Sequence, residues 1–548
     1  MTKPRWGNRL ILILIVIANL TISSGSLPAS SLDLVPDSDS NPPPGPDRFS
    51  IIAVDYMSYD WELRSWKDKS TICELSVEHD GMPLPDEVFQ QCGTIIYRNW
   101  VAQPLCNVNN VTKCDGYYAV LLDTIPKEKE IAMQLPAASA WISIEDCEPV
   151  YSASTNICET QPTLVITGQE PLPNESIVSV EGTYDGQSFH CDDTDTCKFR
   201  IPETGDDGVT VEFWAYSSYG DSSLIYDAQV RVKQVDEGDP DQLYWYVDVL
   251  SSQWQGEISA TCAETWDTFP PVGGAPEWLS TPTQSEDLSS DIPYTYLAAN
   301  LILQGAVDAG TCPDGGLTPG NVVNQCGLER SREAVNEWQN QFDDLILATA
   351  METNVPAKLL KNLFARESQF WPGIFHAAGD IGLGQLTENG ADTALFWNRS
   401  FFNQFCPLVM DSEICGAGYA NLEEDQQEEL RRALVGSVDA SCEDCPLGLD
   451  LTQADFSVGV FAHTLIANCE QTAQVVYNYT GKSPSDVASY EDLWKFTLVN
   501  YNAGGGCLAE ALTGAEGVSD LPLTWDSVSP FLTGACSGAV DYVNDISQ

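Results

Sequence analysis

The sequence predicts a multidomain protein in which N-terminal all-β modules precede a mainly α C-terminal domain. The chain has 548 residues, enough for several domains, and 43% of them are apolar, enough for sizeable cores. Short runs of β-branched and aromatic residues, separated by turn residues, fill much of the first half. From residue 328 onward, apolar residues instead recur at the three- and four-residue steps typical of helices.

The N-terminus has the pattern of an export signal. The basic residues Lys3, Arg5 and Arg9 precede an apolar run that is short for a membrane span, and small residues follow it. Residues 1–26 are therefore predicted to be a signal peptide, which makes the protein secreted or a component of the cell envelope. An uncleaved N-terminal anchor is the alternative, and no other membrane contact is expected. Residues 27–48, rich in Pro, Ser and Asp, are predicted to be a disordered linker.

Four further segments are expected. Residues 49–147 combine short apolar runs with turn signals and predict a small β domain. Residues 148–235 carry stronger strand patterns at the spacing of an immunoglobulin-like β-sandwich. Residues 236–327 combine an apolar run with a Pro/Ser/Thr-rich stretch and a Gly-rich stretch, and are interpreted as a connector. Residues 328–548 form the mainly α domain, with helices expected at 355–368, 421–436, 454–478 and 490–500.

Charge and cysteine content narrow the class of protein. The formal net charge is −55, so DNA, RNA and anionic membrane are excluded as partners. The 18 cysteines are an even number, and several lie close together in pairs, which in an exported chain indicates disulfides. The sequence has only four histidines and a single CxxC motif, so no metal site is predicted.

One carboxylate stands out in the helix predicted at 355–368. Leu363 and Phe364 lie on its apolar face, and Glu367, four and three residues further on, falls on that same face. Loss of water there disfavours the charged form and raises the pKa, as a general acid near neutral pH requires.

Three short motifs follow one another in the helical domain: Glu367-Ser368, Gly382-Leu383-Gly384-Gln385 and Tyr501-Asn502-Ala503-Gly504. Their order resembles that in the lysozyme-like catalytic domain of the soluble lytic transglycosylases. The resemblance covers roughly residues 330–510, about a third of the chain. It implies a lysozyme-like fold for the α domain.

The resemblance also implies an activity on peptidoglycan glycan strands, without a cofactor. Glu367 would protonate the glycosidic oxygen between N-acetylmuramic acid and N-acetylglucosamine. It would then act as a base, so that the sugar's own 6-hydroxyl closes a 1,6-anhydro ring. Ser368 is expected to orient the Glu367 carboxyl, and Gln385 to offer its amide to an N-acetyl group. Tyr501 is expected to bond the acid or stack on a sugar, and Asn502 to fix its loop.

Two departures from the family leave alternatives open. Gly384 stands where the family usually has Met, so one wall of the cleft is expected to lose a side chain. The segment between the second and third motifs is long and rich in cysteine, and such an insertion can cover a groove. Asp380, Glu388 and Asp392 are nearby, but nothing marks one as a second catalytic carboxylate. A hydrolase of the same bond, or a non-catalytic glycan-binding surface protein, are the alternatives.

Overall fold

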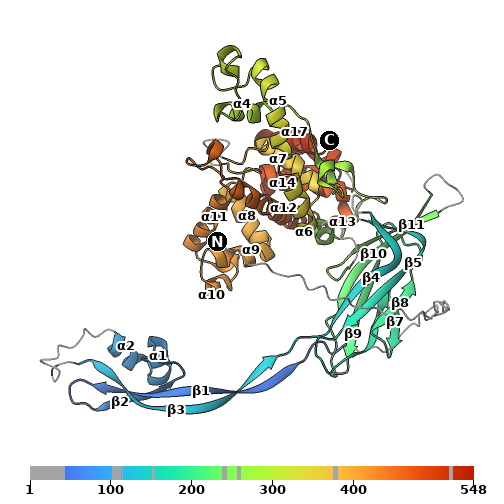
Figure 1. Cartoon of the computed structure of the whole chain (residues 1–548). Coiled ribbons are helices and arrows are strands. Elements are labelled where there is room, and N and C mark those ends of the chain that lie inside the picture. The colour runs from blue at the N-terminus through green and yellow to red at the C-terminus, as the bar shows by residue number, and fades with distance from the viewer. Residues whose placement is uncertain are drawn as a thin grey trace, which may run out of the picture.

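The computed structural model of the chain describes residues 43–101, 113, 115–150, 155–236, 243–255, 261–373, 380–516 and 522–548. Three regions follow one another: a long β-arm, an eight-stranded antiparallel sheet and a helical region (Figure 1). The predictions of a mainly β N-terminal part and a helical C-terminal part are confirmed. The predicted signal peptide, and residues 27–42 of the predicted linker, lie outside the described residues.

The arm is a three-stranded sheet with the strand order β2-β1-β3. β1 (Phe49–Ser65) and β3 (Tyr117–Gln134) pair antiparallel from end to end, and β2 (Thr71–Val77) pairs with the far part of β1. The two long strands curve away from the eight-stranded sheet (Figure 1). Near that sheet they have no third strand, so large apolar side chains such as those of Ile51 and Met133 remain exposed.

A small lobe caps the far end of the arm. α1 (Pro85–Cys92) and α2 (Thr94–Val101) lie there, and the buried core consists of Leu63, Leu75, Val77 and Val88. So few buried side chains are a weak basis for a stable fold. The disulfide between Cys73 and Cys92, which joins β2 to α1, therefore matters for the stability of this lobe.

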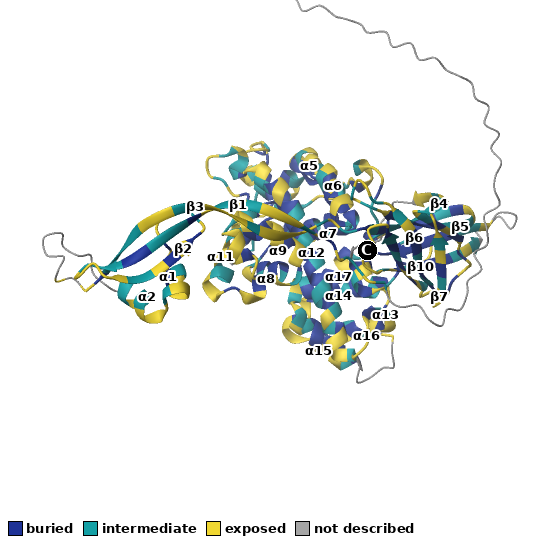
Figure 2. Cartoon of the chain, turned by 90° about the horizontal axis from the view of Figure 1, so that it is seen from below, coloured by how far each residue is buried: buried dark blue, intermediate teal, exposed yellow. Residues whose placement is uncertain are grey.

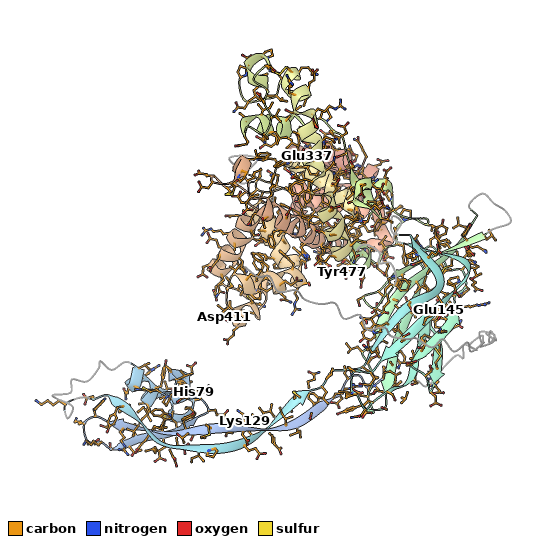
Figure 3. The ribbon with its side chains drawn as sticks, viewed as in Figure 1. His79, Lys129, Glu145, Glu337, Asp411 and Tyr477 are labelled. Carbon is orange, nitrogen blue, oxygen red and sulfur yellow. A yellow bond between two sulfur atoms is a disulfide. The ribbon has the colours of Figure 1, made fainter. Side chains whose placement is uncertain are left out.

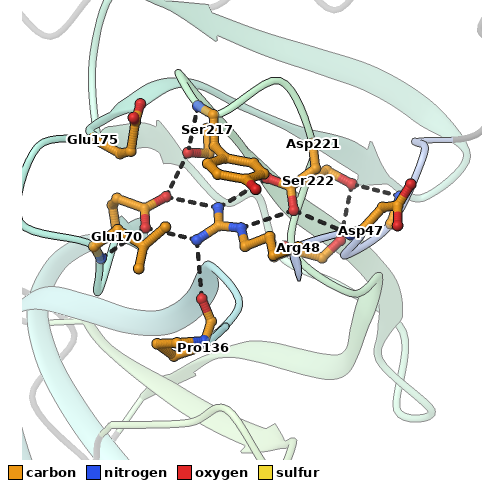
Figure 4. A network of polar contacts seen from close by, with 12 residues as sticks. Asp47, Arg48, Pro136, Glu170, Glu175, Ser217, Asp221 and Ser222 are labelled. Carbon is orange, nitrogen blue, oxygen red and sulfur yellow. Dashed lines mark hydrogen bonds and ion pairs between the residues drawn. The ribbon is translucent and has the colours of Figure 1, made fainter. Parts of the chain in front are cut away.

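Arg48 fastens the base of the arm to the eight-stranded sheet (Figure 4). Its guanidinium donates to both carboxylate oxygens of Asp221, at 2.8 and 2.9 Å, and to both of Glu170, at 2.7 Å. Nη1 also donates to the carbonyl of Pro136 at 3.1 Å. All three charged side chains are at least 95% buried. Removal of Arg48 would leave two buried carboxylates without a cation, which typically costs about 3–5 kcal/mol. Residue 48, the last of the predicted linker, is thus a packed residue.

The eight-stranded sheet has the order β4-β5-β11-β10-β9-β6-β7, with β8 paired to β5. All its pairings are antiparallel. Its strands are β4 (Ser139–Val150), β5 (Thr155–Gln169), β6 (Ile177–Tyr184), β7 (Gln187–Asp192), β8 (Thr196–Arg200), β9 (Val209–Ser217), β10 (Tyr226–Asp236) and β11 (Leu243–Leu250).

The sheet folds into two facing layers. β4 and β5 lie opposite β9 across a core that includes Ile142, Ile166 and Phe213. The alternating pattern of β9, in which every second side chain is buried, follows from this arrangement. β4 begins inside the first predicted β domain, and β11 lies inside the predicted connector. The sequence of β11 is a clear apolar run, but it does not reveal which sheet the strand joins.

The rest of the predicted connector is part of the helical region. In α3 (Thr261–Trp266), Cys262 forms a disulfide with Cys469, 207 residues later. The indole of Trp266 donates a 3.2 Å hydrogen bond to the carbonyl of Cys469 and packs edge-on against Trp494, with ring centres 5.2 Å apart. The helical region therefore begins near residue 261.

One continuous core runs through the helical region, as the buried centre in Figure 2 shows. The longer helices are α4 (Thr295–Leu303), α5 (Gln325–Asn340), α6 (Asp343–Thr353), α7 (Ala357–Ser368), α8 (Glu388–Trp397), α9 (Arg399–Phe405), α11 (Glu424–Ser437), α12 (Leu451–Thr480), α14 (Tyr490–Ala503), α15 (Gly505–Glu516) and α17 (Gly538–Ile546). Single turns are α10 (Ser412–Cys415), α13 (Pro484–Val487), α16 (Trp525–Val528), η3 (Glu277–Leu279), η4 (Ser285–Leu288), η5 (Pro313–Gly316), η6 (Cys406–Leu408), η7 (Tyr419–Asn421), η8 (Pro446–Gly448), η9 (Ser529–Phe531) and η10 (Gly534–Cys536).

Disulfides recur in all three regions, and no described cysteine is free. Those expected from close spacing are present at Cys191–Cys197, Cys406–Cys415 and Cys442–Cys445. The others are Cys147–Cys158, Cys312–Cys326 and Cys507–Cys536, in addition to the two above. Cys106 and Cys114 lie outside the described residues.

Acidic side chains such as Glu337 and Asp411 stand on the surface (Figure 3), where their charge is solvated. Within the described part of the chain, no helix combines the length and the apolar character that a membrane span requires, and this includes the 30-residue α12.

Candidate active site

Glu367 lies in the last turn of α7, three residues after the fully buried Phe364, and its side chain is partly buried. α17, near the end of the chain, packs against α7 (Figure 1). From α17 the hydroxyl of Tyr542 donates a 2.6 Å hydrogen bond to Oε1 of Glu367. The carboxyl group is thus held by a neutral donor.

Burial raises the pKa of Glu367 to about 7. Desolvation is the main cause, because the ionised carboxylate loses hydration at this position. The negative charge of Asp380 raises the pKa further, whereas the Tyr542 hydrogen bond and the charge of Arg366 lower it. Near neutral pH a large share of Glu367 is therefore protonated, which is the state that a general acid needs.

Arg366 is adjacent to Glu367 in sequence and, besides lowering the pKa of Glu367, contacts α17. Its Nε forms a 3.0 Å ion pair with Asp545, and its guanidinium lies 5.6 Å from the ring centre of Tyr542. These contacts hold α17 against α7. Arg366 therefore supports the position of Tyr542.

Ser368 does not have the position expected for it. Its side chain is fully buried, and its hydroxyl donates to the carbonyl of Leu383 at 2.7 Å and, more weakly, to that of Phe364 at 3.3 Å. It has no hydrogen bond to Glu367 among those described and does not line the cavity. The orienting role predicted for Ser368 is replaced by an indirect one: it ties the second motif to the end of α7.

Gln385 lies in the loop after α7 in the left-handed conformation, with φ +56°. Its Nε2 donates a 2.7 Å hydrogen bond to the carbonyl of Gly382, which fixes the orientation of the amide. Its Oε1 is buried, with no hydrogen-bond partner among the described residues. Because Gln385 lines the cavity beside Glu367, this oxygen suits a ligand N–H or O–H group.

Gly384 is packed tightly against Phe461 of α12. A Cβ atom at residue 384 would lie 2.5 Å from Cδ1 of Phe461, closer than any side chain tolerates. A side chain at residue 384 therefore has no room, and neither Gly384 nor Phe461 is among the residues that line the cavity described below.

Tyr501, in the last turn of α14, donates a 2.7 Å hydrogen bond to the carbonyl of Gly384. Burial, with the charge of Glu367, raises the pKa of Tyr501 well above its usual range, so the hydroxyl remains a donor. Tyr501 thus lies in the field of the acid without bonding it directly. Asn502, exposed at the end of α14, lines the same cavity.

A cavity of about 750 Å³ brings these residues together. Glu367, Gln385, Tyr501, Asn502 and Tyr542 all line it. Residues 394–463, the central part of the segment between the second and third motifs, contribute nothing to the lining, whereas both ends of that segment do, for example with Thr387 and Asn468. Most of the lining is neutral and polar, with amide and hydroxyl side chains from the loop 380–387, α8, α12 and α14.

The three nearby acids have different positions. Asp380 lines the cavity, close enough for its charge to act on Glu367. Glu388 is exposed and does not line it. Asp392 accepts hydrogen bonds from the hydroxyl of Tyr419 at 2.7 Å and from Arg431 at 3.2 Å, so its role is structural. Only Asp380 qualifies as a second carboxylate.

Sequence reasoning missed Tyr542 and Asn500. Tyr542 is 175 residues from Glu367 and belongs to an amphipathic helix whose apolar face predicts core packing. Asn500 lies one residue before the third motif. A polar side chain on the buried face of α14 is the signal by which the sequence could have identified it.

Comparisons with protein-family models, with curated proteins and with solved structures give no match to this chain. Among the described residues, no group of three or more His, Cys, Asp or Glu side chains is arranged to hold a metal ion. The description of the candidate site therefore rests on the positions and contacts of its own residues.

Proposed function

We propose that the protein is an exported peptidoglycan lytic transglycosylase. It cleaves the bond between N-acetylmuramic acid and N-acetylglucosamine with Glu367 and leaves 1,6-anhydro ends. On this proposal the helical region is a lysozyme-like domain, and the eight-stranded sheet is an immunoglobulin-like module that positions it at the wall. The disulfides are compatible with an extracytoplasmic protein.

The observation that carries the proposal is the state of Glu367. It is a partly buried carboxyl with a pKa of about 7, hydrogen-bonded by Tyr542, in a cavity lined by neutral amides and hydroxyls. Such an acid gives a proton to a glycosidic oxygen and then takes one back from a hydroxyl. The lining suits a ligand rich in hydroxyl and amide groups.

A hydrolase of the same bond is the second candidate, and Asp380 is the observation that favours it. A second carboxylate in the same cavity can activate a water or stabilise the developing positive charge. A non-catalytic glycan-binding protein is the third candidate. It is disfavoured because a binding site has no need for a desolvated acid.

Glu367→Gln tests the assignment of the acid. The substitution keeps the shape of the side chain and removes the proton donor, so wall lysis should fall by about two to three orders of magnitude. A purified, folded variant that lyses walls at more than about a tenth of the wild-type rate contradicts the assignment.

Product analysis separates the first two candidates. Mass spectrometry of released glycans should find 1,6-anhydro ends, lighter by one water than hydrolysis products. If the wild type releases mainly reducing ends, and Asp380→Asn no longer releases them, the protein is a hydrolase.

A further inference from the structure

The charges around the cavity disfavour a ligand with a carboxylate. Only three charged side chains line it in the part of the chain that the structure describes: Arg366, Glu367 and Asp380. Arg366 is paired with Asp545 at 3.0 Å. Arg366 is therefore the one cation among the described lining residues, and its Nε is already paired, whereas Asp380 would repel a carboxylate.

The unpaired polar atoms of the cavity wall also favour a ligand without a carboxylate. Oδ1 of Asn500 is buried and, like Oε1 of Gln385, has no hydrogen-bond partner among the described residues. The Nδ2 group of Asn500 donates to the carbonyl of Asn468 at 3.2 Å and to Oε1 of Gln471 at 3.1 Å, so the amide cannot rotate without losing both bonds. These two of the cavity-lining amides thus offer acceptor oxygens, which favour N–H and O–H groups and disfavour another acceptor.

The muramic acid residue exists in two forms, which differ in the charge and the hydrogen-bonding capacity of the lactyl group. In a strand with its stem peptide, the lactyl group on the sugar ring is an amide, which is neutral and carries an N–H donor. Hydrolysis of that amide by an amidase leaves a lactyl carboxylate on the ring itself. The carboxylates of the stem peptide are further along the peptide, where solvent and salt screen them over about 8 Å.

We infer that the cavity accepts the muramic acid residue with its lactyl group as an uncharged amide and rejects it as a carboxylate. The inference rests on the proposed function and gives the protein a place in a reaction sequence. It acts on glycan strands before an amidase removes their stem peptides, because the product of that reaction carries the wrong charge for this cavity.

The test uses the mature full-length protein and three soluble glycan strands. The first strand carries stem peptides, the second has been stripped by an amidase, and the third has been stripped and its lactyl carboxylates then converted chemically to methylamides. Cleavage of the first should exceed that of the second by about tenfold or more in kcat/KM, a ratio that one nearby like charge can produce. The methylamide strand should recover most of the loss, although it has no peptide.

Asp380→Asn should reduce the difference between the first two strands to about threefold or less, because the repelling charge is gone. Glu388→Gln is the matched control: it removes the same charge from an exposed position outside the cavity and should keep the full difference.

Equal or faster cleavage of the stripped strand by the wild type would overturn the inference and leave the proposed function intact. A methylamide strand that behaves like the stripped one would show that the peptide is recognised, and would also overturn it. Cleavage of none of the three strands would overturn the inference together with the proposed function.

Discussion

Tyr542→Phe is a direct probe of the acid. The substitution removes only the hydroxyl that donates the 2.6 Å hydrogen bond to Glu367. That bond favours the ionised carboxylate, so its loss raises the pKa of Glu367. The protonated acid then persists to higher pH, and the alkaline limb of the pH–rate profile should move upward.

The size of the shift follows from the strength of the bond. A hydrogen bond to a charged group contributes about 1.5–3 kcal/mol, and one pKa unit corresponds to about 1.4 kcal/mol. Because Glu367 is only partly buried, water replaces part of the lost interaction. We therefore expect the alkaline limb to move by about one pH unit, the lower end of this range.

The assay is the rate of release of soluble fragments from purified peptidoglycan between about pH 5 and pH 10, around the reference pKa values of Glu and Tyr. Tyr501→Phe is the control, because the Tyr501 hydroxyl donates to the carbonyl of Gly384 and its loss should leave the limb in place. An alkaline limb that is identical in wild type and Tyr542→Phe, or that moves equally in both variants, would refute the assignment of this limb to Glu367.

Three further predictions concern stability and charge. Folding raises the pKa of Glu367 from 4.5 to about 7. Its contribution to stability is therefore complete below about pH 4.5 and is lost as the pH rises through about 7, so Glu367→Gln should gain about 1–3 kcal/mol relative to wild type above pH 7 and nothing at pH 4, measured by thermal unfolding. Replacement of Cys262 and Cys469 by Ser should cost about 2–5 kcal/mol, because their bridge closes a 207-residue loop. The same change at Cys442 and Cys445, three residues apart, should cost clearly less in a denaturant titration. A chain with a net charge of −55 should lyse anionic walls faster as salt increases from low to moderate concentration, whereas the rate on a neutral N-acetylglucosamine oligomer should stay flat; a steady decrease on walls would contradict this.

The division of the fold was predictable where local patterns decide it. The helices expected at 355–368, 421–436, 454–478 and 490–500 correspond to α7, α11, α12 and α14. Strand pairing over long distances was not predictable. β11 was assigned to a connector because its apolar run contains no sign that it joins β10 and β5. Likewise, Arg48 follows a Pro-rich segment and looked like a linker residue, although its charge is buried between Asp221 and Glu170.

The burial of Glu367 could be predicted because its position depends on one helix. The spacing of Glu367 from Phe364 already implied burial, and the raised pKa agrees with it. The partners of the acid depend on tertiary packing. The family resemblance suggested that Ser368 orients the carboxyl, whereas α17 supplies Tyr542 from the far end of the chain. Residues brought in by helix packing have no signal at the level of motif spacing.

Gly384 shows why a motif is an incomplete description of a site. Considered alone, glycine in place of a larger residue implies a gap in the wall. In the fold, the ring of Phe461 occupies that space, since a Cβ atom at residue 384 would come within 2.5 Å of it. The hydroxyl of Tyr501 meanwhile binds the carbonyl of the same glycine at 2.7 Å, so the loop is held from two sides. The position of Gly384 is thus set by residues of two neighbouring helices, α12 and α14. A substitution within the motif is informative only together with the side chains that pack against it, because close packing couples their sizes.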